Sequence, residues 1–295
     1  MSFKSGFISI IGKPNVGKST LLNALLNQKV AITSPKPQTT RHRITGVLNT
    51  NHYQMIFVDT PGMHSGKHLL GRTIDKVATT AIQDVDCLLL VVDRPYHQGD
   101  EAILQRIKTT KVPVILVINK IDQLSSKTEI DEIIFSFISI FEFAEIIPIS
   151  AKEAKHLEYL KTAILQYLPV GPQYFSADYV SDQSETKLAA EIVRERILHH
   201  AEQEVPHAVT VVIESMKDNL ETNTLDVSAL IIVERPTQKQ ILIGKNGAKL
   251  KQIGTEARKE INRLLKTKIH LTLWIKVKKD WRNNQNEIKR YGYGE

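Results

Sequence analysis

A glycine-rich loop near the N-terminus contains the first residues whose types and spacing could do chemistry. Positions 12–19 read GKPNVGKS, which matches the pattern G-x4-G-K-[ST] and follows an apolar run. Glycines let backbone N–H groups close around phosphate oxygens at a helix N-terminus. Lys18 is expected to reach the β- and γ-phosphates, and the Ser19 hydroxyl to ligate Mg2+. The pattern predicts a nucleoside triphosphate site formed by Gly12, Asn15, Val16, Gly17, Lys18, Ser19 and Thr20.

A second motif, NKID at 119–122, selects the base. It follows another apolar run, where the Asp122 carboxylate could accept hydrogen bonds from the N1 and N2 donors of guanine. Adenine lacks this pair of donors. The later tripeptide SAK would close the base pocket with a backbone N–H. The predicted guanine-binding residues are Asn119, Lys120, Asp122, Ser150, Ala151 and Lys152.

Two further segments are predicted to serve the metal and the γ-phosphate. In the tetrapeptide DTPG, Asp59 can hold Mg2+ through water and the Gly62 N–H can meet the γ-phosphate. The tetrapeptide QTTR lies in the interval where a mobile segment would supply another Mg2+ ligand, and we favour Thr40 over Thr39. With Ser19, these residues are the predicted metal ligands. An ordinary turn at DTPG and a polar loop at QTTR are the alternatives.

The elements that must position these motifs follow an alternating order. Unalternating Val/Ile-rich runs are typical of strands buried on both faces, and helices between them supply the crossovers of a parallel sheet. The expected strands are 7–11, 53–58, 87–93, 114–119 and 146–149. The expected helices are 19–27, 101–109, 129–140 and 157–168. This order predicts a three-layer α/β domain with a mostly parallel sheet over residues 1–172.

The order changes after a polar stretch at 173–184, which follows a Pro/Gly-rich break and is predicted to be a linker. Residues 185–295 are predicted to form a smaller α+β domain with a basic C-terminal tail. Its expected elements are a helix at 185–204, strands at 209–213 and 225–233, a loop, a basic helix from 248 to 265 and a strand at 269–277.

Charge is distributed unevenly along the 295 residues. The net charge is +3 over 1–180, −6 over 181–230 and +10 over 231–295. A basic last fifth indicates a polyanionic partner, with a solvated lysine-rich face as the alternative. The single cysteine, Cys87, argues against a disulfide scaffold and a multi-cysteine zinc site. No apolar run approaches the ~20 residues of a membrane span, so we expect a soluble cytoplasmic protein.

The five motifs GKPNVGKS, QTTRH, DTPG, NKID and SAK, in this order, resemble those of the Era family of bacterial ribosome-assembly GTPases. The basic end resembles a type II KH domain, because GKNG at 244–247 matches the G-x-x-G clamp and the element order is α-β-β-α-α-β. A lone G-x-x-G is otherwise an ordinary turn. The RNA-binding residues would be Gly244, Lys245, Asn246, Gly247, Lys249 and Lys251. Ile243 and Ile253 are candidate groove liners, with plain core packing the favoured alternative.

This resemblance implies GTP/GDP and Mg2+ as cofactors and the 3′ region of 16S rRNA and the small ribosomal subunit as partners. It implies a monomer that assists 16S rRNA processing and small-subunit biogenesis, with loose association with the inner face of the membrane. Two alternatives stay open. One is a largely non-catalytic, nucleotide-gated RNA chaperone, and the other is a membrane-associated or RNA-modification GTPase.

Hydrolysis is expected to be slow without assistance. Ras-like GTPases place a Gln after the D-x-x-G glycine to position water, and Met63 stands there in this chain. The predicted catalytic residues are Lys18, Thr40, Gly62 and Asn15. Related GTPases with Asn at the place of Asn15 bind K+ there, which would add positive charge between the phosphates. An Asn suited only to the loop conformation is the alternative.

Overall fold

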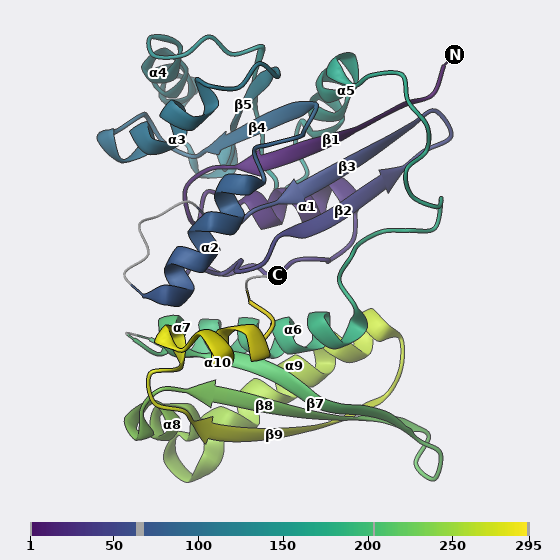
Figure 1. Ribbon diagram of the computed structural model, residues 1–295, viewed down its shortest axis with the longest axis vertical. Helices are drawn as coiled ribbons and strands as arrows, with labels where there is room; N and C mark the ends of the chain where they lie inside the picture. The colour runs from purple at the N-terminus through teal and green to yellow at the C-terminus, as the bar shows by residue number, and fades with distance from the viewer. Residues whose placement is uncertain (1, 63–67, 203, 294–295) are drawn as a thin grey trace. The chain divides into compact units, whose positions relative to one another are not determined.

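The computed structural model describes residues 2–62, 68–202 and 204–293. These residues form two compact units (Figure 1). The first unit contains residues up to Ala31, Thr40 to Gly62, and Ile74–Asp182. The second contains Ile32–Thr39, residues 68–73, and the chain from Gln183 onward. Within the described ranges, every helix is too short or too polar to cross a membrane.

The first unit is built on a six-stranded sheet with the order β2-β3-β1-β4-β5-β6. Neighbouring strands are parallel except β2 and β3, which pair antiparallel. Every residue of β4 and β5 is buried, as predicted for strands covered on both faces. The strands are β1 Lys4–Ile11, β2 Ile44–Asn49, β3 Tyr53–Asp59, β4 Cys87–Val92, β5 Val114–Ile118 and β6 Glu145–Pro148.

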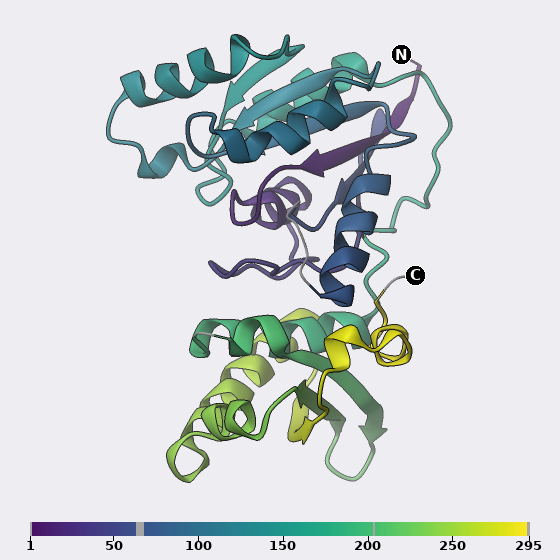
Figure 2. The same cartoon turned by 60° about the vertical axis from the view of Figure 1, so that its left-hand side comes forward.

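Helices cover both faces of this sheet (Figures 1 and 2). Apolar side chains of α1 and α5 pack on one face, and those of α2, α3 and α4 pack on the other. The helices are α1 Lys18–Leu26, α2 Leu69–Thr80, α3 Glu101–Ile107, α4 Lys127–Ile138 and α5 Leu157–Tyr167. The prediction of a three-layer α/β domain with a mostly parallel sheet is confirmed.

Two elements of the first unit, β2 and α2, were not predicted. Neither contains the long apolar run by which the other elements were recognised. In α2 the buried residues Leu70, Ile74 and Ala78 recur every four positions, so only one face of the helix is apolar. The strand β2 lies at the sheet edge and mixes polar with apolar residues. The remaining elements of this unit lie where they were predicted, with shifted ends.

The polar stretch after α5 is ordered along β2 and β3 of the first unit. The Gln54 side chain accepts hydrogen bonds from the N–H groups of Tyr174 and Phe175 at 2.8 and 3.1 Å. The Val47 N–H donates to the Val180 carbonyl oxygen at 2.8 Å. Residues 173–182, predicted to be part of a linker, therefore add to the packing of this unit.

The second unit has a three-stranded sheet, ordered β7-β8-β9, in which β8 pairs antiparallel with β7 and parallel with β9. Helices α6, α8 and α9 pack on one face and form its core. The strands are β7 Thr210–Asn219, β8 Thr224–Val233 and β9 Ile269–Val277. The helices are α6 Glu185–His200, α7 Val205–Ala208, α8 Pro236–Ile243, α9 Ala248–Leu265 and α10 Gln285–Arg290. The α-β-β-α-α-β order of the KH resemblance is confirmed by α6, β7, β8, α8, α9 and β9, and the short helices α7 and α10 are additional.

Three details of the second unit differ from the prediction. Helix α8 stands where a loop was expected before the basic helix, and it begins at Pro236, a residue suited to a first helical turn. Strand β7 continues to Asn219 through a register shift between Ile213 and Ser215. Helix α6 ends at His200, four residues earlier than expected.

Candidate functional site

The glycine-rich loop connects β1 to α1. Gly12 has φ +149° and Gly17 has φ +96°, a region that residues with a Cβ rarely adopt. A Cβ on Gly12 would lie 2.4 Å from the Val91 carbonyl oxygen, and one on Gly17 would lie 2.3 Å from Asn119 Nδ2. Both positions therefore require glycine. The loop leads directly into the N-terminus of α1, where unpaired N–H groups favour an anion.

Lys18 points back into this loop. Its Nζ donates to the carbonyl oxygens of Gly12 at 3.1 Å and Lys13 at 2.8 Å. Burial lowers the pKa of Lys18 to about 8, although the carboxylates of Asp59 and Asp93 act in the opposite direction. The ammonium group is thus held within the turn that the sequence predicts to surround phosphate.

The other predicted residues of the loop differ in exposure. Val16 is buried, Thr20 is half-buried in the first turn of α1, and Asn15 is exposed. Asn15 has φ +66°, a conformation that Asn tolerates better than most residues.

Three predicted metal ligands converge beside the loop. The Ser19 Oγ lies 2.6 Å from Thr40 Oγ1 and donates to Asp59 Oδ2 at 2.6 Å. The neighbouring Thr39 hydroxyl instead donates to the Lys36 carbonyl oxygen at 2.6 Å. Of the two threonines, Thr40 is therefore the one beside Ser19. The cluster consists only of oxygen atoms, the donor type that Mg2+ prefers.

The environment of Asp59 fits a cation. Its side chain is fully buried, and its Oδ1 has no hydrogen-bond partner among the described residues. Burial raises the pKa of Asp59 to about 6, despite the opposing effects of Lys18 and the hydrogen bond from Ser19. A buried carboxylate oxygen without a partner is costly unless an ion or donor satisfies it. The observed donor set therefore matches the expected Mg2+ site.

The DTPG segment passes close to the glycine-rich loop. A Cβ on Gly62 would lie 2.7 Å from both Cα and N of Pro14, so only glycine permits this approach. Buried Thr60 anchors the segment by donating from Oγ1 to the Ile10 carbonyl oxygen at 2.9 Å. The prediction concerning Met63 lies outside the described residues.

Asn119 joins the glycine-rich loop to the predicted base pocket. Its Nδ2 donates to the Val16 carbonyl oxygen at 2.9 Å, and its Oδ1 accepts from the Ala151 N–H at 3.0 Å. The Ser150 Oγ donates to Asp122 Oδ1 at 2.6 Å, which orients that half-buried carboxylate. The structure thus brings NKID and SAK together.

The two lysines of these motifs are placed differently. Lys120 has φ +64° and its Nζ lies 2.6 Å from Asp93 Oδ2. Lys152 is exposed. Lys120 therefore ties the NKID segment to the end of β4.

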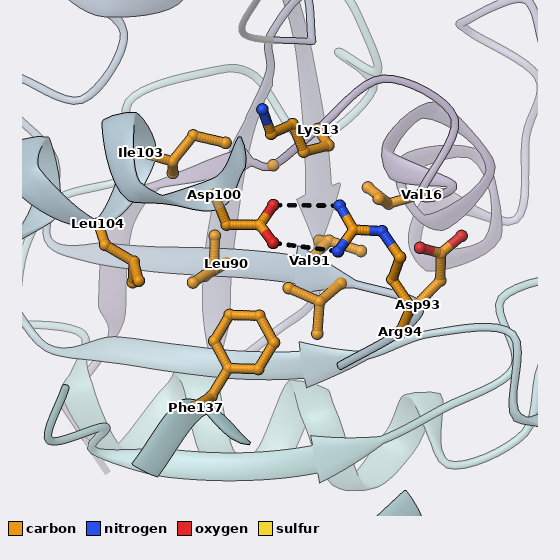
Figure 3. Close-up of a pocket in the computed structure, with 12 residues that line it drawn as sticks. Lys13, Val16, Leu90, Val91, Asp93, Arg94, Asp100, Ile103, Leu104 and Phe137 are labelled. Atoms are coloured by element: carbon orange, nitrogen blue, oxygen red, sulfur yellow. Dashed lines mark hydrogen bonds and ion pairs between the residues drawn. The ribbon is translucent and has the colours of Figure 1, made fainter. Parts of the chain in front are cut away.

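A small pocket lies behind the glycine-rich loop (Figure 3). Its free volume is about 10 Å³, close to the space for one water molecule. Arg94 and Asp100 face one another across it, with Nη–Oδ distances of 3.1 and 3.3 Å. Phe137 and Val91 supply apolar walls. The pocket is too small for a base or phosphate, and the side chains that line it pack beneath the glycine-rich loop.

The second unit presents the predicted G-x-x-G loop between α8 and α9. Gly244 has φ +71°, and a Cβ there would lie 2.8 Å from Lys249 Cβ. Gly247 has φ +77° with open space around it. Lys245 and Asn246 are exposed in the turn between the two glycines. Backbone and charge are thus both available to a polyanion at this turn.

A groove of about 510 Å³ runs from this loop along α9 and β9. Its predicted members are Gly247 and Lys251. The other lining residues were not predicted; they are Leu250, Gly254, Thr255, Arg258, Leu271 and Leu273. The sequence pattern could have identified them, because the residues on α9 recur at helical spacing and the two leucines on β9 are two positions apart, so each set shares one face of its element. Neither Ile243 nor Ile253 lines this groove. Ile253 is instead fully buried in the core of the second unit, which agrees with the alternative of plain core packing.

Comparisons with known proteins identify the same two kinds of domain. A family model described as 50S ribosome-binding GTPase matches residues 7–120, and a KH domain model matches residues 204–282. The chain is 48% identical over 295 residues to the GTPase Era of Clostridioides difficile (strain 630), covering 99% of both chains. It is 45% identical over 293 residues to the GTPase Era of Clostridium botulinum (strain Hall), covering 99% of this chain and 98% of the relative.

Two solved structures match the whole fold. An Aquifex aeolicus Era variant bound to GDP·AlF4− has a TM-score of 0.94 at 41% identity, covering 99% of this chain and 100% of that one. A structure of Era in complex with MgGDPNP and nucleotides 1506–1542 of 16S ribosomal RNA has a TM-score of 0.93 at 41% identity, with the same coverage. The nucleotide motifs, the KH domain and this near-complete similarity together show that the chain belongs to the Era family of GTPases.

Proposed function

We propose that this GTPase controls, through its bound nucleotide, how its KH domain binds the 3′ region of 16S rRNA during small-subunit biogenesis. The observation that carries the proposal is the pairing of two sites in one chain. One is the convergence of Ser19, Thr40 and Asp59 at the phosphate loop. The other is the exposed glycine-lysine turn that opens onto a groove. The relative solved with MgGDPNP and nucleotides 1506–1542 of 16S ribosomal RNA supports this choice of partner.

The nucleotide would be held from both ends. Backbone N–H groups of the glycine-rich loop would bind the phosphates, with Lys18 exchanging its two carbonyl partners for phosphate oxygens. At the other end, Asp122 would accept from guanine N1 and N2, with Ser150 orienting its carboxylate. Asn119 would hold the phosphate loop and the base-binding loop at a fixed distance, because its side chain is hydrogen-bonded to Val16 in the first and Ala151 in the second.

The residues that would hold Mg2+ are Ser19 and Thr40 directly and Asp59 through water. A Mg2+ ion there supplies positive charge that offsets the negative charge of the β- and γ-phosphate oxygens. Gly62 lies against the phosphate loop, and its N–H would donate to the γ-phosphate. Thr40, Gly62 and Lys18 would thus act by orientation and charge rather than by covalent chemistry.

Asn15 is proposed as a K+ ligand, since it is an exposed residue at the phosphate loop. Its positive φ suits an Asn chosen for loop conformation equally well. Comparing turnover in potassium and sodium buffers, with Mg2+ saturating, separates the two. Equal rates in the two buffers would remove the K+ site.

The KH domain would bind unpaired RNA along the groove. Gly244 and Gly247 would admit the RNA backbone to the turn, and Lys245, Lys249 and Lys251 would supply charge. Leu271 and Leu273 form an apolar floor on which bases can lie.

The decisive experiment measures the affinity of an RNA with the 16S 3′-end sequence in the presence of GDP and of a non-hydrolysable GTP analogue. We expect tighter binding with the analogue, and by reciprocity tighter analogue binding with RNA. Equal affinities would contradict the coupling. Crosslinking in cells, followed by sequencing of the bound RNA, tests the partner independently.

A largely non-catalytic RNA chaperone is the second candidate, favoured by the place of Met63 at the position where Ras-like GTPases carry Gln. Single-turnover hydrolysis with and without RNA distinguishes the two. Stimulation by RNA supports the switch, whereas RNA binding without any change in a negligible hydrolysis rate supports the chaperone.

A further inference from the structure

The segment Ile32–Thr39, which leads into Thr40, packs within the second unit and not with the phosphate loop. Two consecutive residues of α6 bind its ends. The Thr33 N–H donates to Glu195 Oε1 at 2.8 Å. Arg194 Nη2 donates a short hydrogen bond to the carbonyl oxygen of Thr39. The segment is therefore attached mainly by backbone groups, with a longer hydrogen bond of 3.4 Å from the Thr33 hydroxyl to Glu195 Oε1.

Both α6 side chains are buried and held by other charges. The Arg194 side chain is fully buried, and its Nε and Nη2 donate to the two carboxylate oxygens of Glu191 at 2.8 and 2.6 Å. Glu195 is 1% exposed, and its Oε2 accepts from Arg196 Nη2 at 2.5 Å. Planar, bidentate pairs of this kind restrict the guanidinium to one orientation. The Arg194 donor thus presents a fixed position to the Thr39 carbonyl.

Fixing the Thr39 carbonyl restricts the next residue. The C=O of Thr39 and the N–H of Thr40 belong to one planar peptide group, so holding the first orients the second. The chain passes from the second unit to the first between these two residues. Within the first unit, the Thr40 hydroxyl lies 2.6 Å from Ser19 Oγ. Holding the Thr39 carbonyl therefore limits the positions that Thr40 can adopt.

We propose that Arg194 and Glu195 are positioning residues for the GTPase reaction: they anchor the backbone of Ile32–Thr39 so that Thr40 is presented to the metal site. This rests on the proposed role of Thr40 as a Mg2+ ligand. The anchor should increase nucleotide affinity only when Thr40 can bind the Mg2+ ion at the phosphates. It should therefore increase the affinity for Mg2+-GTP more than the affinity for GDP. Neither residue contacts the nucleotide in this scheme.

The main test replaces Arg194 and measures nucleotide binding without RNA. Arg194→Met keeps much of the aliphatic bulk and removes the guanidinium group. Arg194→Lys keeps the positive charge but replaces the planar guanidinium by a single ammonium group. We expect Arg194→Met to raise the Mg2+ concentration that half-saturates binding of a non-hydrolysable GTP analogue by about tenfold, as loss of one charged hydrogen bond implies. Arg194→Lys should lie between this variant and the wild type, and GDP affinity should stay unchanged in both.

A matched control is Arg282→Met. Arg282 is another largely buried arginine of the second unit, paired with Glu234 at 2.6 Å. Its side chain also donates to the His207 carbonyl oxygen, outside the segment. This variant should leave the ratio of analogue to GDP affinity unchanged. Equal losses of analogue and GDP affinity in Arg194→Met, or the same loss in the control, would overturn the proposal.

Hydrogen exchange supplies a readout that does not depend on folding of the variants. In the wild type with Mg2+ and the GTP analogue, the Thr33 amide should be protected, because it donates to Glu195. Free exchange of that amide in this state would overturn the proposal whatever the variants do. In Arg194→Met the amides of the segment should exchange faster, with unchanged fluorescence of Trp274 and Trp281 showing that the second unit is folded.

These measurements contain no RNA, so they separate the two claims. If the 16S fragment fails to bind but the Arg194 results are as expected, the proposed RNA function fails and the anchor stands. If Arg194→Met binds Mg2+ and the GTP analogue as the wild type does, while the wild type binds the 16S fragment more tightly with the analogue than with GDP, the anchor fails and the proposed function stands.

Discussion

Asp59→Asn tests whether the buried carboxylate beneath the phosphate loop lowers the unfolding free energy of the nucleotide-free protein and serves to bind a cation. The side chain is fully buried, its Oδ1 lacks a partner among the described residues, and burial raises its pKa from 3.8 to about 6. Between these two values the folded protein binds more protons than the unfolded chain. The contribution of Asp59 to the unfolding free energy therefore falls as the pH rises from about 4 to about 6, and is constant above that window.

The size of the effect follows from the two pKa values. Ionised Asp59 lowers the unfolding free energy by about 1 kcal/mol at pH 4.5 and by about 3 kcal/mol at pH 7.5, relative to a group that does not titrate. An Asn amide has its own constant cost if its N–H groups lack partners, but that cost does not vary with pH. We therefore expect the stability difference, variant minus wild type, to increase by about 2 kcal/mol between pH 4.5 and pH 7.5.

The assay must report on the first unit alone. Both tryptophans lie in the second unit, whereas the single cysteine, Cys87, is buried in β4. The urea midpoint for labelling of Cys87, with a disulfide reagent that reacts at acid pH, follows unfolding of the first unit. Asp131→Asn, which removes an exposed carboxylate of α4, controls for the change in net charge.

Adding Mg2+ and a GTP analogue should stabilise the wild type more than Asp59→Asn. A ligand at a hundred times its Kd stabilises the folded wild type by about 2.7 kcal/mol, and Asp59→Asn should lose most of this gain. The reasoning is refuted if the nucleotide-free variant shows a pH-independent stability difference, or if Mg2+ and the analogue stabilise it as strongly as the wild type.

Three further perturbations address the base pocket, the RNA loop and the phosphate loop. Asp122→Asn should weaken GTP binding by about 10–100-fold and favour xanthosine triphosphate, because an amide donates where the carboxylate accepts; competition binding measures this. Replacing Lys245 and Lys249 by Ala should reduce the slope of log K against log salt for single-stranded RNA by between about 1.4 and 2. Gly17→Ala should destabilise the first unit by about 1–3 kcal/mol and abolish nucleotide binding, since its Cβ would lie 2.3 Å from Asn119 Nδ2.

Each of these has a matched comparison. Unchanged preference for guanine in Asp122→Asn would contradict the base contact. The double substitution of Lys266 and Lys268, at the other end of α9, should affect RNA binding less than the loop pair; equal effects would indicate a diffuse basic surface. Gly247→Ala has a positive φ but open space around it, so it isolates the backbone cost from the steric clash at Gly17.

Much of the site could be predicted because its chemistry is local in sequence. The loop at 12–19 places glycines, Lys18 and Ser19 within one turn, so their spacing alone determines which groups can face a phosphate. The choice of Thr40 over Thr39 was less local, and it agrees with the position of its hydroxyl beside Ser19. The boundaries of the basic helix α9 followed from the same kind of reasoning, since the G-x-x-G loop, the lysines and the helical spacing are contiguous in the sequence.

Other features were decided by tertiary structure. Asn119 bonds to Val16 across 103 residues, and Ser19 to Asp59 across 40, because parallel strand order brings their loops to one edge of the sheet. The groove floor at Leu271 depends on the pairing of β8 with β9. Arg194 shows the limit most clearly. In the sequence it is one charge on a polar helix, and only packing reveals that it is buried against the Thr39 carbonyl. Local spacing determines which chemistry a segment can perform, whereas long-range packing determines which segments meet.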